Sequence, residues 1–198
     1  MMGKEATFEF EVDEEKDKVT LIRYNETDED FRVIELPSFV THIGIYPFFS
    51  VRQSLKIIHK DNKIKDMPWF MSGYDGKRLD LSEFDTTGVK ETMFMFGSNI
   101  RLETIELSDN LKSMGNYAFR KCESLKEIVI PDSVEAIGLF CFSECESLKR
   151  LVISKSLDRL ENDAINNCYN IKEIVIRSNN TEVDTGIKRR FNVKYEVI

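Results

Sequence analysis

The 198-residue sequence has few of the residues that build metal and disulfide sites: it contains two histidines and four cysteines. Two histidines leave little material for a histidine metal site, and we predict no metal ion or cofactor. Four cysteines in a chain of this length are too few for a fold held together by disulfides. No stretch approaches the roughly 18 consecutive apolar residues of a membrane-spanning helix. We therefore expect no insertion into a membrane.

Positive charge is also scarce. The sequence has 28 Lys and Arg residues against 35 Asp and Glu residues, a formal net charge of −7. A net acidic chain is a poor candidate for binding nucleic acids or anionic membranes, so we expect no nucleic-acid partner. The excess of acids lies in residues 9–30, while the rest of the chain is close to neutral. Like charges at one end discourage end-to-end association, and we expect a monomer.

The N-terminal residues contain no export signal. No apolar segment of secretory length precedes the first acidic residue, Glu5. Gly3 follows two methionines instead of one, so it is not placed for N-myristoylation. We expect a cytoplasmic protein in a reducing compartment. The alternative is an extracellular or cell-surface protein whose leader has been removed.

The sequence does have an internal repeat. The pattern Leu-x-x-Ile-x-Ile that begins at Leu125 recurs, and its last residue falls at positions 107, 130, 153 and 176, a constant step of 23. The intervening half repeats in the same register. Its columns contain apolar residues (Leu111, Val134, Leu157), glycines (Gly115, Gly138), Phe119 with Phe142, and cysteines (Cys122, Cys145, Cys168). A fixed period of this length indicates stacked structural units.

Each unit is predicted to contain one short strand and a return segment. The alternation at the end of Leu-x-x-Ile-x-Ile is typical of a strand with one buried face. Gly115 and Gly138 suit a backbone position with positive φ, and Phe119 and Phe142 are predicted to point inward from a short helical turn. One unit cannot bury its apolar face alone, whereas stacked units can. We predict an α/β solenoid of about seven rungs, built from short parallel strands, turns and short helices.

The chain divides into a solenoid and two caps. Upstream strands are predicted at Phe31-x-x-Ile34-x-Leu36 and at Leu55-x-x-Ile58, where Lys60 takes the next core position. The predicted parts are an N-terminal β-hairpin cap (residues 1–30, with strands at 7–12 and 19–24), the solenoid (31–176, with an irregular segment at 59–76) and a C-terminal cap (177–198, with a short helix at 183–191 and a last strand at 192–198).

The repeat resembles a known family. The run Ile130-Pro131-x-x-Val134-x-x-Ile137-Gly138-x-x-Cys141-Phe142-x-x-Cys145-x-x-Leu148-x-x-Leu151 is similar to the 23-residue leucine-rich repeat of the BspA-like, or treponemal, type. Residues 79–107 resemble a variant found in bacterial surface lipoproteins, and the resemblance spans about residues 31–176. It departs from the pattern at Thr92, Glu161, Ile165 and segment 59–76. The resemblance implies a leucine-rich-repeat solenoid used for protein recognition and adhesion, without shared catalytic residues.

Several side chains have both a structural and a functional interpretation. Cys122, Cys141, Cys145 and Cys168 are predicted to be buried free thiols, because side chains in register run parallel, too far apart at Cβ for a disulfide. His42 and His59 occupy unrelated repeat positions and are predicted to be exposed. The aromatic side chains of the irregular segment are expected to fill a distorted rung and not to form an exposed patch; they are Trp69, Phe70 and Tyr74.

A small hydrolase with its site in the 59–76 region is an alternative function. No motif supplies a nucleophile, a base and a group that orients the base, which argues against catalysis. A pocket beside His59 with several titratable groups of shifted pKa would support it.

The best site candidate is the outward side of the strands, here called the strand face, which we expect to be concave. Residues between the inward apolar positions point to this face. Val129, Val152 and Val175 are predicted to form an apolar stripe with a charged rim, which suits a peptide or protein groove. The candidate protein-binding residues are Glu106, Glu127, Val129, Arg150, Val152, Glu173, Val175 and Arg177.

We therefore predict a non-enzymatic protein-interaction module whose protein or peptide partner is unidentified. The main alternative is a cell-surface adhesin or a secreted effector of the same family. Another explanation of the valine stripe is that valine favours β-strands, in which case these residues have no binding role.

Overall fold

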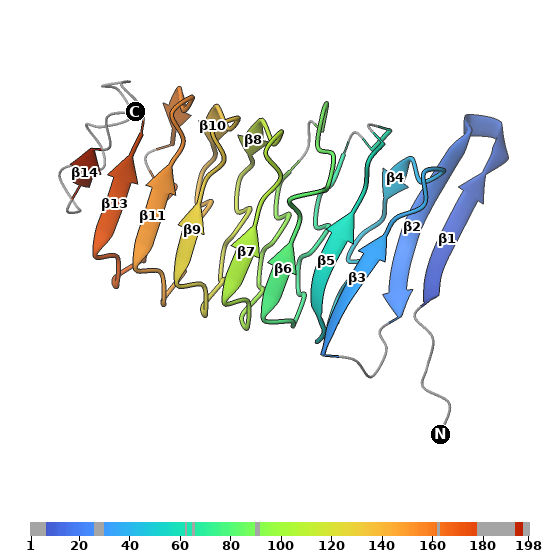
Figure 1. The fold of residues 1–198 in the computed structure, drawn as a ribbon, viewed down its shortest axis with the longest axis horizontal. Helices are drawn as coiled ribbons and strands as arrows, with labels where there is room; N and C mark the ends of the chain where they lie inside the picture. Colours follow the sequence, from blue (N-terminus) through green and yellow to red (C-terminus); the bar gives the residue numbers. More distant parts are fainter. Residues whose placement is uncertain are drawn as a thin grey trace.

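The computed structural model describes residues 7–25, 30–61, 63–64, 66–89, 92–161, 163–177 and 193–195. The chain winds into an elongated stack with a β-hairpin at one end and β14 at the other (Figure 1). Successive turns of the chain each contribute one strand to a long face, and the chain returns through turns and very short strands. The structure is therefore a solenoid, the architecture that the 23-residue period predicts.

The strands of the long face pair in parallel. Their order is β3-β5-β6-β7 in one sheet and β9-β11-β13-β14 in a second. Leu151 pairs with Ile128 on one side and Ile174 on the other, so each repeat position becomes a register position. The bounds are β3 Phe31–Glu35, β5 Ser54–Ile58, β6 Arg78–Asp80, β7 Thr104–Glu106, β9 Glu127–Val129, β11 Arg150–Ile153, β13 Glu173–Ile176 and β14 Val193–Tyr195.

The return half of each turn of the solenoid contains no α-helix among the described residues. A second row of two-residue parallel strands runs along this side: β8 Ser113–Met114, β10 Ala136–Ile137 and β12 Arg159–Leu160. The one helical element in the described part is a 3₁₀ helix, η1 Glu14–Lys16. The α/β class with short helices is therefore corrected to a β-solenoid, and about six turns replace the seven expected rungs.

Hydrogen bonding explains why the inward-pointing phenylalanines do not lie on helices. The backbone N–H of Phe119 donates to the carbonyl of Cys141 in the next turn (2.7 Å), and the N–H of Phe142 donates to that of Ala164 (2.8 Å). In an α-helix these N–H groups would bond to carbonyls four residues earlier. Bonds between successive turns use them instead, so the return segments remain chains of turns.

Two columns of aromatic rings run along the stack. Phe96, Phe119 and Phe142 stack inside the core with ring centroids 4.6 and 5.5 Å apart. A second, partly exposed column consists of Trp69, Phe94, Tyr117 and Phe140. All four residues of this outer column have positive φ, which is strained for large side chains. Stacking at fixed intervals compensates for that strain and links each turn to the next.

The glycine column has a different cause from the one predicted. Gly115 and Gly138 are not among the residues with positive φ. Instead, adjacent turns approach closely at these positions. A Cβ atom added to Gly138 would lie 2.8 Å from the backbone nitrogen of Asn116, and one added to Gly115 would lie 2.9 Å from that of Met93. Glycine recurs at these two positions because there is no room for a Cβ atom between adjacent turns, and not because the backbone has positive φ.

Most of the segment predicted to be irregular belongs to the stack. Met71 donates its N–H to the carbonyl of Met95 (2.8 Å), and Gly73 donates to that of Gly97 (3.0 Å). Gly73 has φ = 72°, a positive value that glycine adopts more easily than other residues. Phe70 and Tyr74 are fully buried, as the rung-filling interpretation predicts.

The N-terminal hairpin is present as predicted. β1 (Thr7–Asp13) and β2 (Lys18–Asn25) pair antiparallel, and β2 continues in parallel to β4 (His42–Ile43). The hairpin therefore extends the short-strand side of the solenoid. At the other end, β14 pairs in parallel with β13, within the predicted last strand. The predicted helix at 183–191 lies outside the described residues.

All four cysteines are free and buried, as predicted. Three of them form a column in which each thiol donates to a carbonyl of the preceding turn: Cys122 to Phe96 (3.2 Å), Cys145 to Phe119 (3.1 Å) and Cys168 to Phe142 (2.8 Å). Burial raises the pKa of the Cys141 thiol well above its ordinary value. These thiols therefore have a hydrogen-bonding role in addition to the small-hydrophobe role expected of them.

Candidate functional site

The predicted site residues lie on or beside successive strands of the strand face. Glu106 is on β7, Glu127 and Val129 are on β9, and the other predicted residues are on β11 and β13 or directly after β13. Arg150 pairs in register with Glu127 and with Glu173, and Val152 pairs with Val129 and Val175. The sequence period thus brings residues together that are 23 or 46 positions apart.

Arg150 is the centre of a charged cluster on this face. Its guanidinium donates to Glu127 on one side and to Glu173 on the other, the latter at 2.8 Å. The hydrogen bonds to Glu173 and Glu127 raise the pKa of Arg150 above its ordinary value. Arg177 lies 3.9 Å from the carboxylate of Asp132. The predicted charges are therefore largely matched within the chain, and they fix the local geometry.

The continuous apolar stripe is not found. Val129 is 45% exposed, but Val152 is fully buried and Val175 is only 2% exposed. β11 and β13 each have hydrogen-bonded strands on both sides, whereas β9 is the edge strand of its sheet. Of the three valines, only Val129, on the edge strand, is exposed.

The strand face is interrupted next to that edge. No strand pairing joins β7 to β9 among the described residues, although each pairs with its other neighbour. On the return side the same two turns are joined, because Phe96 donates to Ala118 and Ser98 donates to Arg120, both at 2.7 Å. The stack is therefore closed at its back and open at its strand face.

The length of the repeat does not account for this interruption. Ile105 and Ile128 are 23 residues apart, the same step as that between Leu151 and Ile174, which do pair. The longer step, of 26 residues, lies between Leu79 and Ile105, and these two residues pair in register. The spacing of the repeats therefore carries no signal for the break.

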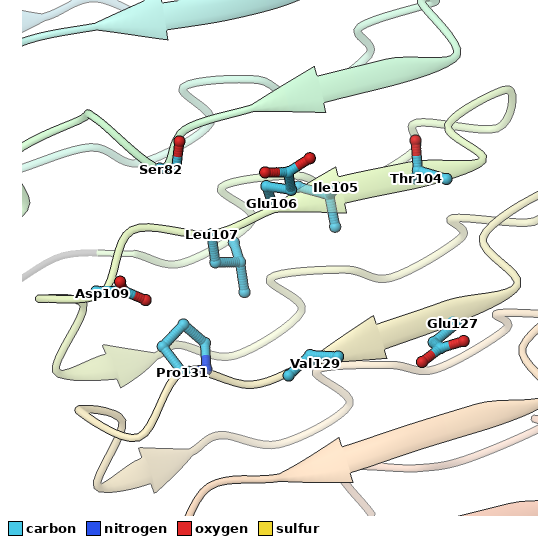
Figure 2. A pocket seen from close by; sticks show the side chains of 9 residues that line it. All are labelled: Ser82, Thr104, Ile105, Glu106, Leu107, Asp109, Glu127, Val129 and Pro131. Carbon is cyan, nitrogen blue, oxygen red and sulfur yellow. The ribbon is translucent and has the colours of Figure 1, made fainter.

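The interruption opens a cleft of about 490 Å³ between β7 and β9, here called the β7–β9 cleft. Ile105 and Leu107 point from the β7 side toward Val129 and Pro131 on the β9 side (Figure 2). Its lining consists of Ser82, Thr104, Ile105, Glu106, Leu107, Asp109, Glu127, Val129 and Pro131. Three of these residues were predicted from the sequence: Glu106, Glu127 and Val129. The outward-pattern argument did not predict Ile105, Leu107, Asp109 and Pro131 as site residues. A cleft of this size suits one or two side chains of a partner.

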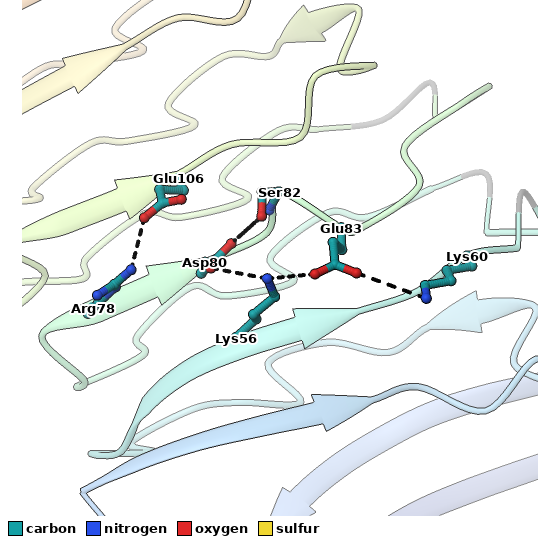
Figure 3. A network of polar contacts seen from close by, with 7 residues as sticks. All are labelled: Lys56, Lys60, Arg78, Asp80, Ser82, Glu83 and Glu106. Atoms are coloured by element: carbon teal, nitrogen blue, oxygen red, sulfur yellow. Dashed lines mark hydrogen bonds and ion pairs between the residues drawn. The ribbon is translucent and has the colours of Figure 1, made fainter.

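A polar network covers the strand face on the other side of the cleft (Figure 3). Lys56 contacts Glu83 at 2.6 Å and Asp80 at 3.6 Å, and Asp80 accepts a hydrogen bond from the Ser82 hydroxyl at 2.7 Å. The hydrogen bond from Lys56 lowers the pKa of Glu83. Burial alone would raise the pKa of Asp80, but the hydrogen bonds from Ser82 and the charge and hydrogen bond of Lys56 together lower it. Both carboxylates are thus held in the ionised form.

His59 is buried, contrary to the prediction. Leu55 and Ile57 face inward on β5, and His59 follows them in the same alternation into the core. The core positions predicted for Ile58 and Lys60 are therefore wrong, because these two residues lie on the other side of the chain. The residue in the same register on the preceding turn is Leu36, since β3 and β5 pair with Ile34 opposite Ile57. The Nε2 atom of His59 has no hydrogen-bond partner among the described residues. Burial lowers the pKa of this histidine.

A second cavity, of about 360 Å³, adjoins His59 and shares Ser82 and Asp109 with the β7–β9 cleft. It is the kind of pocket that the hydrolase alternative requires. However, the Ser108 hydroxyl donates to the carbonyl of Phe84 (2.6 Å), and the Ser82 hydroxyl donates to Asp80. The Nε2 atom of His59 has no hydrogen bond to a hydroxyl in the described part of the chain. The structure therefore shows no hydroxyl activated by this histidine atom.

Replacement of His59 by leucine is expected to stabilise the protein. Leucine occupies the equivalent core position at Leu36, and the change removes a buried nitrogen without a partner, at a gain of about 1–3 kcal/mol in the free energy of unfolding. The gain should grow as the pH falls from 7.5 to 5.5. The unfolded histidine binds a proton near pH 6.5 while the folded one, whose pKa is lower, does not, so the wild type loses stability as the pH falls below 6.5.

Urea unfolding of wild type and His59→Leu at the two pH values tests this expectation. His42→Gln is the control, because His42 is exposed on β4 and its removal should change the free energy of unfolding little. Equal stability of wild type and His59→Leu at both pH values would contradict the destabilising effect of this buried nitrogen without a hydrogen-bond partner.

Comparison with known proteins supports the repeat assignment. The family described as "BspA type Leucine rich repeat region" matches residues 87–190 in six copies. The solved leucine-rich repeat protein of T. pallidum is 23% identical, with a TM-score of 0.51, and the match covers 85% of this chain and 68% of that one. The pneumococcal vaccine antigen PcpA is 19% identical, with a TM-score of 0.56, over 92% of this chain and 45% of the antigen.

These structural similarities show a shared fold. No curated protein matches the chain. No described helix is long and apolar enough to cross a membrane. The family match covers more than half of the sequence and contains the 23-residue columns described above. The chain is therefore a member of the BspA-type leucine-rich repeat family.

Proposed function

We propose that the chain is a non-enzymatic protein-interaction module that binds a protein or peptide on its strand face, centred on the β7–β9 cleft. The observation that carries the proposal is the break in strand pairing beside Val129, which opens a cleft where Val129 is exposed and Ile105 is partly exposed. Apolar area surrounded by charges is the usual composition of a protein-binding surface. The leucine-rich repeat fold is consistent with such a role.

The predicted charged residues form the surroundings of this centre. Glu106 and Glu127 line the cleft, while Arg150, Glu173 and Arg177 extend along the strand face from β11 to beyond β13. Val152 and Val175 are buried and therefore present no accessible surface to a partner. A partner would thus contact apolar side chains in the cleft and matched charges beside it.

Blocking the cleft should abolish binding without unfolding the chain. A library of 12-residue peptides displayed on phage would be selected on the full chain, and the enriched peptides would be measured by fluorescence polarisation. Val129→Trp places a large ring at the mouth of the cleft, and we expect it to weaken these peptides at least about tenfold, a loss of about 1.4 kcal/mol.

Leu139→Trp is the matched control, because Leu139 is exposed on the return side of the solenoid. Peptides should bind this variant as tightly as they bind wild type. Circular dichroism should give the same melting temperature for both tryptophan variants. Equal binding to wild type and Val129→Trp, or a library that yields no binder, would overturn the proposal.

A further inference from the structure

The charges around the β7–β9 cleft have one sign. Its lining includes three carboxylates, from Glu106, Asp109 and Glu127, and contains no lysine or arginine. In Figure 2 Glu106 and Asp109 lie on the β7 side and Glu127 lies beside Val129 on the β9 side. The apolar lining is thus bordered by acidic groups on both sides.

These three carboxylates are not equally neutralised. Glu106 accepts a hydrogen bond from Arg78 at 2.9 Å, and Glu127 accepts one from Arg150. Asp109 has no ion pair with any residue in the described part of the chain. One exposed negative charge therefore remains available at the edge of an apolar cleft, and it favours a positively charged group of a partner.

The adjoining cavity continues the acidic character. It shares Asp109 with the cleft and adds Glu83 and Asp85, with Lys60 as its one lysine. Burial opposes ionisation of Asp85, but hydrogen bonds from Thr87 outweigh it and lower its pKa. The groove from Val129 past Asp109 is thus apolar at one end and anionic at the other.

We infer, resting on the proposed function, that the partner segment carries a lysine or arginine next to an aliphatic side chain. The aliphatic group fills the space between Leu107 and Val129, and the cation lies against Asp109. Arginine is the better fit for a carboxylate, because its planar guanidinium presents several donors at once. A charged hydrogen bond of this kind also discriminates against acidic segments.

Peptide selection with a charge-reversed cleft tests this inference. The same phage library would be selected on wild type, on Asp109→Lys and on Glu123→Lys, followed by sequencing of the enriched pools. We expect wild type to enrich lysine or arginine beside Leu, Ile or Val. Asp109→Lys should shift the enriched pool toward Asp and Glu at that position. Glu123→Lys makes the same change of charge at an exposed turn outside the cleft and should enrich the wild-type motif.

A binding measurement provides a second readout. Replacement of the basic residue of an enriched peptide by norleucine should weaken binding to wild type about tenfold or more, and 0.5 M NaCl should weaken the parent peptide more than the norleucine peptide. If the wild-type pool contains no basic residue, or if Asp109→Lys enriches the same sequences as wild type, the inference is wrong. The proposed function would still stand in that case, provided that Val129→Trp blocks the enriched peptides.

Discussion

Val152→Glu is expected to unfold most of the solenoid. Val152 lies in the middle of β11 without exposed surface, between Val129 and Val175 in register. A carboxylate at this position loses its hydration, and an unmatched buried charge costs about 3–5 kcal/mol. Because a domain is stabilised by only about 5–15 kcal/mol in total, most of the free energy of unfolding would be lost. Urea unfolding followed by circular dichroism measures the loss.

Val129→Glu is the matched control for this prediction. It makes the same substitution in the same column, one turn earlier, at a side chain that is 45% exposed. The added carboxylate stays hydrated there, so the free energy of unfolding should change by less than about 0.5 kcal/mol. Equal stability of the two variants would show that the side chain at position 152 of β11 is not buried.

Phe119→Ala is the second change with a large expected effect. Phe119 is buried between Phe96 and Phe142, with ring centroids 4.6 and 5.5 Å away. Truncation of a buried phenylalanine costs about 3–5 kcal/mol, because both the transfer energy and the contacts with two neighbouring rings are lost. In a solenoid each turn is stabilised mainly by its neighbours. Amide hydrogen exchange should therefore become faster in the turns on both sides of the change.

Tyr117→Ala serves as its control, because Tyr117 occupies the outer aromatic column of the same turn. Its ring stacks on Phe94 at 4.7 Å and on Phe140 at 5.5 Å, but it is only partly buried. Alanine keeps the strained positive φ, so the loss should reflect the two ring contacts and the contact with the Arg120 guanidinium, 5.8 Å from the ring centroid, together about 1–3 kcal/mol. A loss as large as that of Phe119→Ala would show that the outer column, and not the core, holds the turns together.

Much of the fold could be predicted because the repeat is explicit. The column that contains Ile128, Leu151 and Ile174 pairs in register as expected, and the cysteine column is buried as expected. The N-terminal hairpin follows from period-2 alternation around an acidic turn. The helices were a wrong expectation, since local patterning does not reveal that the backbone N–H groups bond to the next turn.

The sequence by itself determined the repeating unit, its period and which side chains face the core, because stacking of identical units fixes register along the whole solenoid. Only the tertiary structure decided which outward valine is accessible and that His59 enters the core. It also decided where the strand face opens. These outcomes depend on how one turn is offset from its neighbours. β9 has no partner strand on the side of β7 among the described residues, although Ile105 and Ile128 are a regular 23 residues apart, and the β7–β9 cleft lies at this edge.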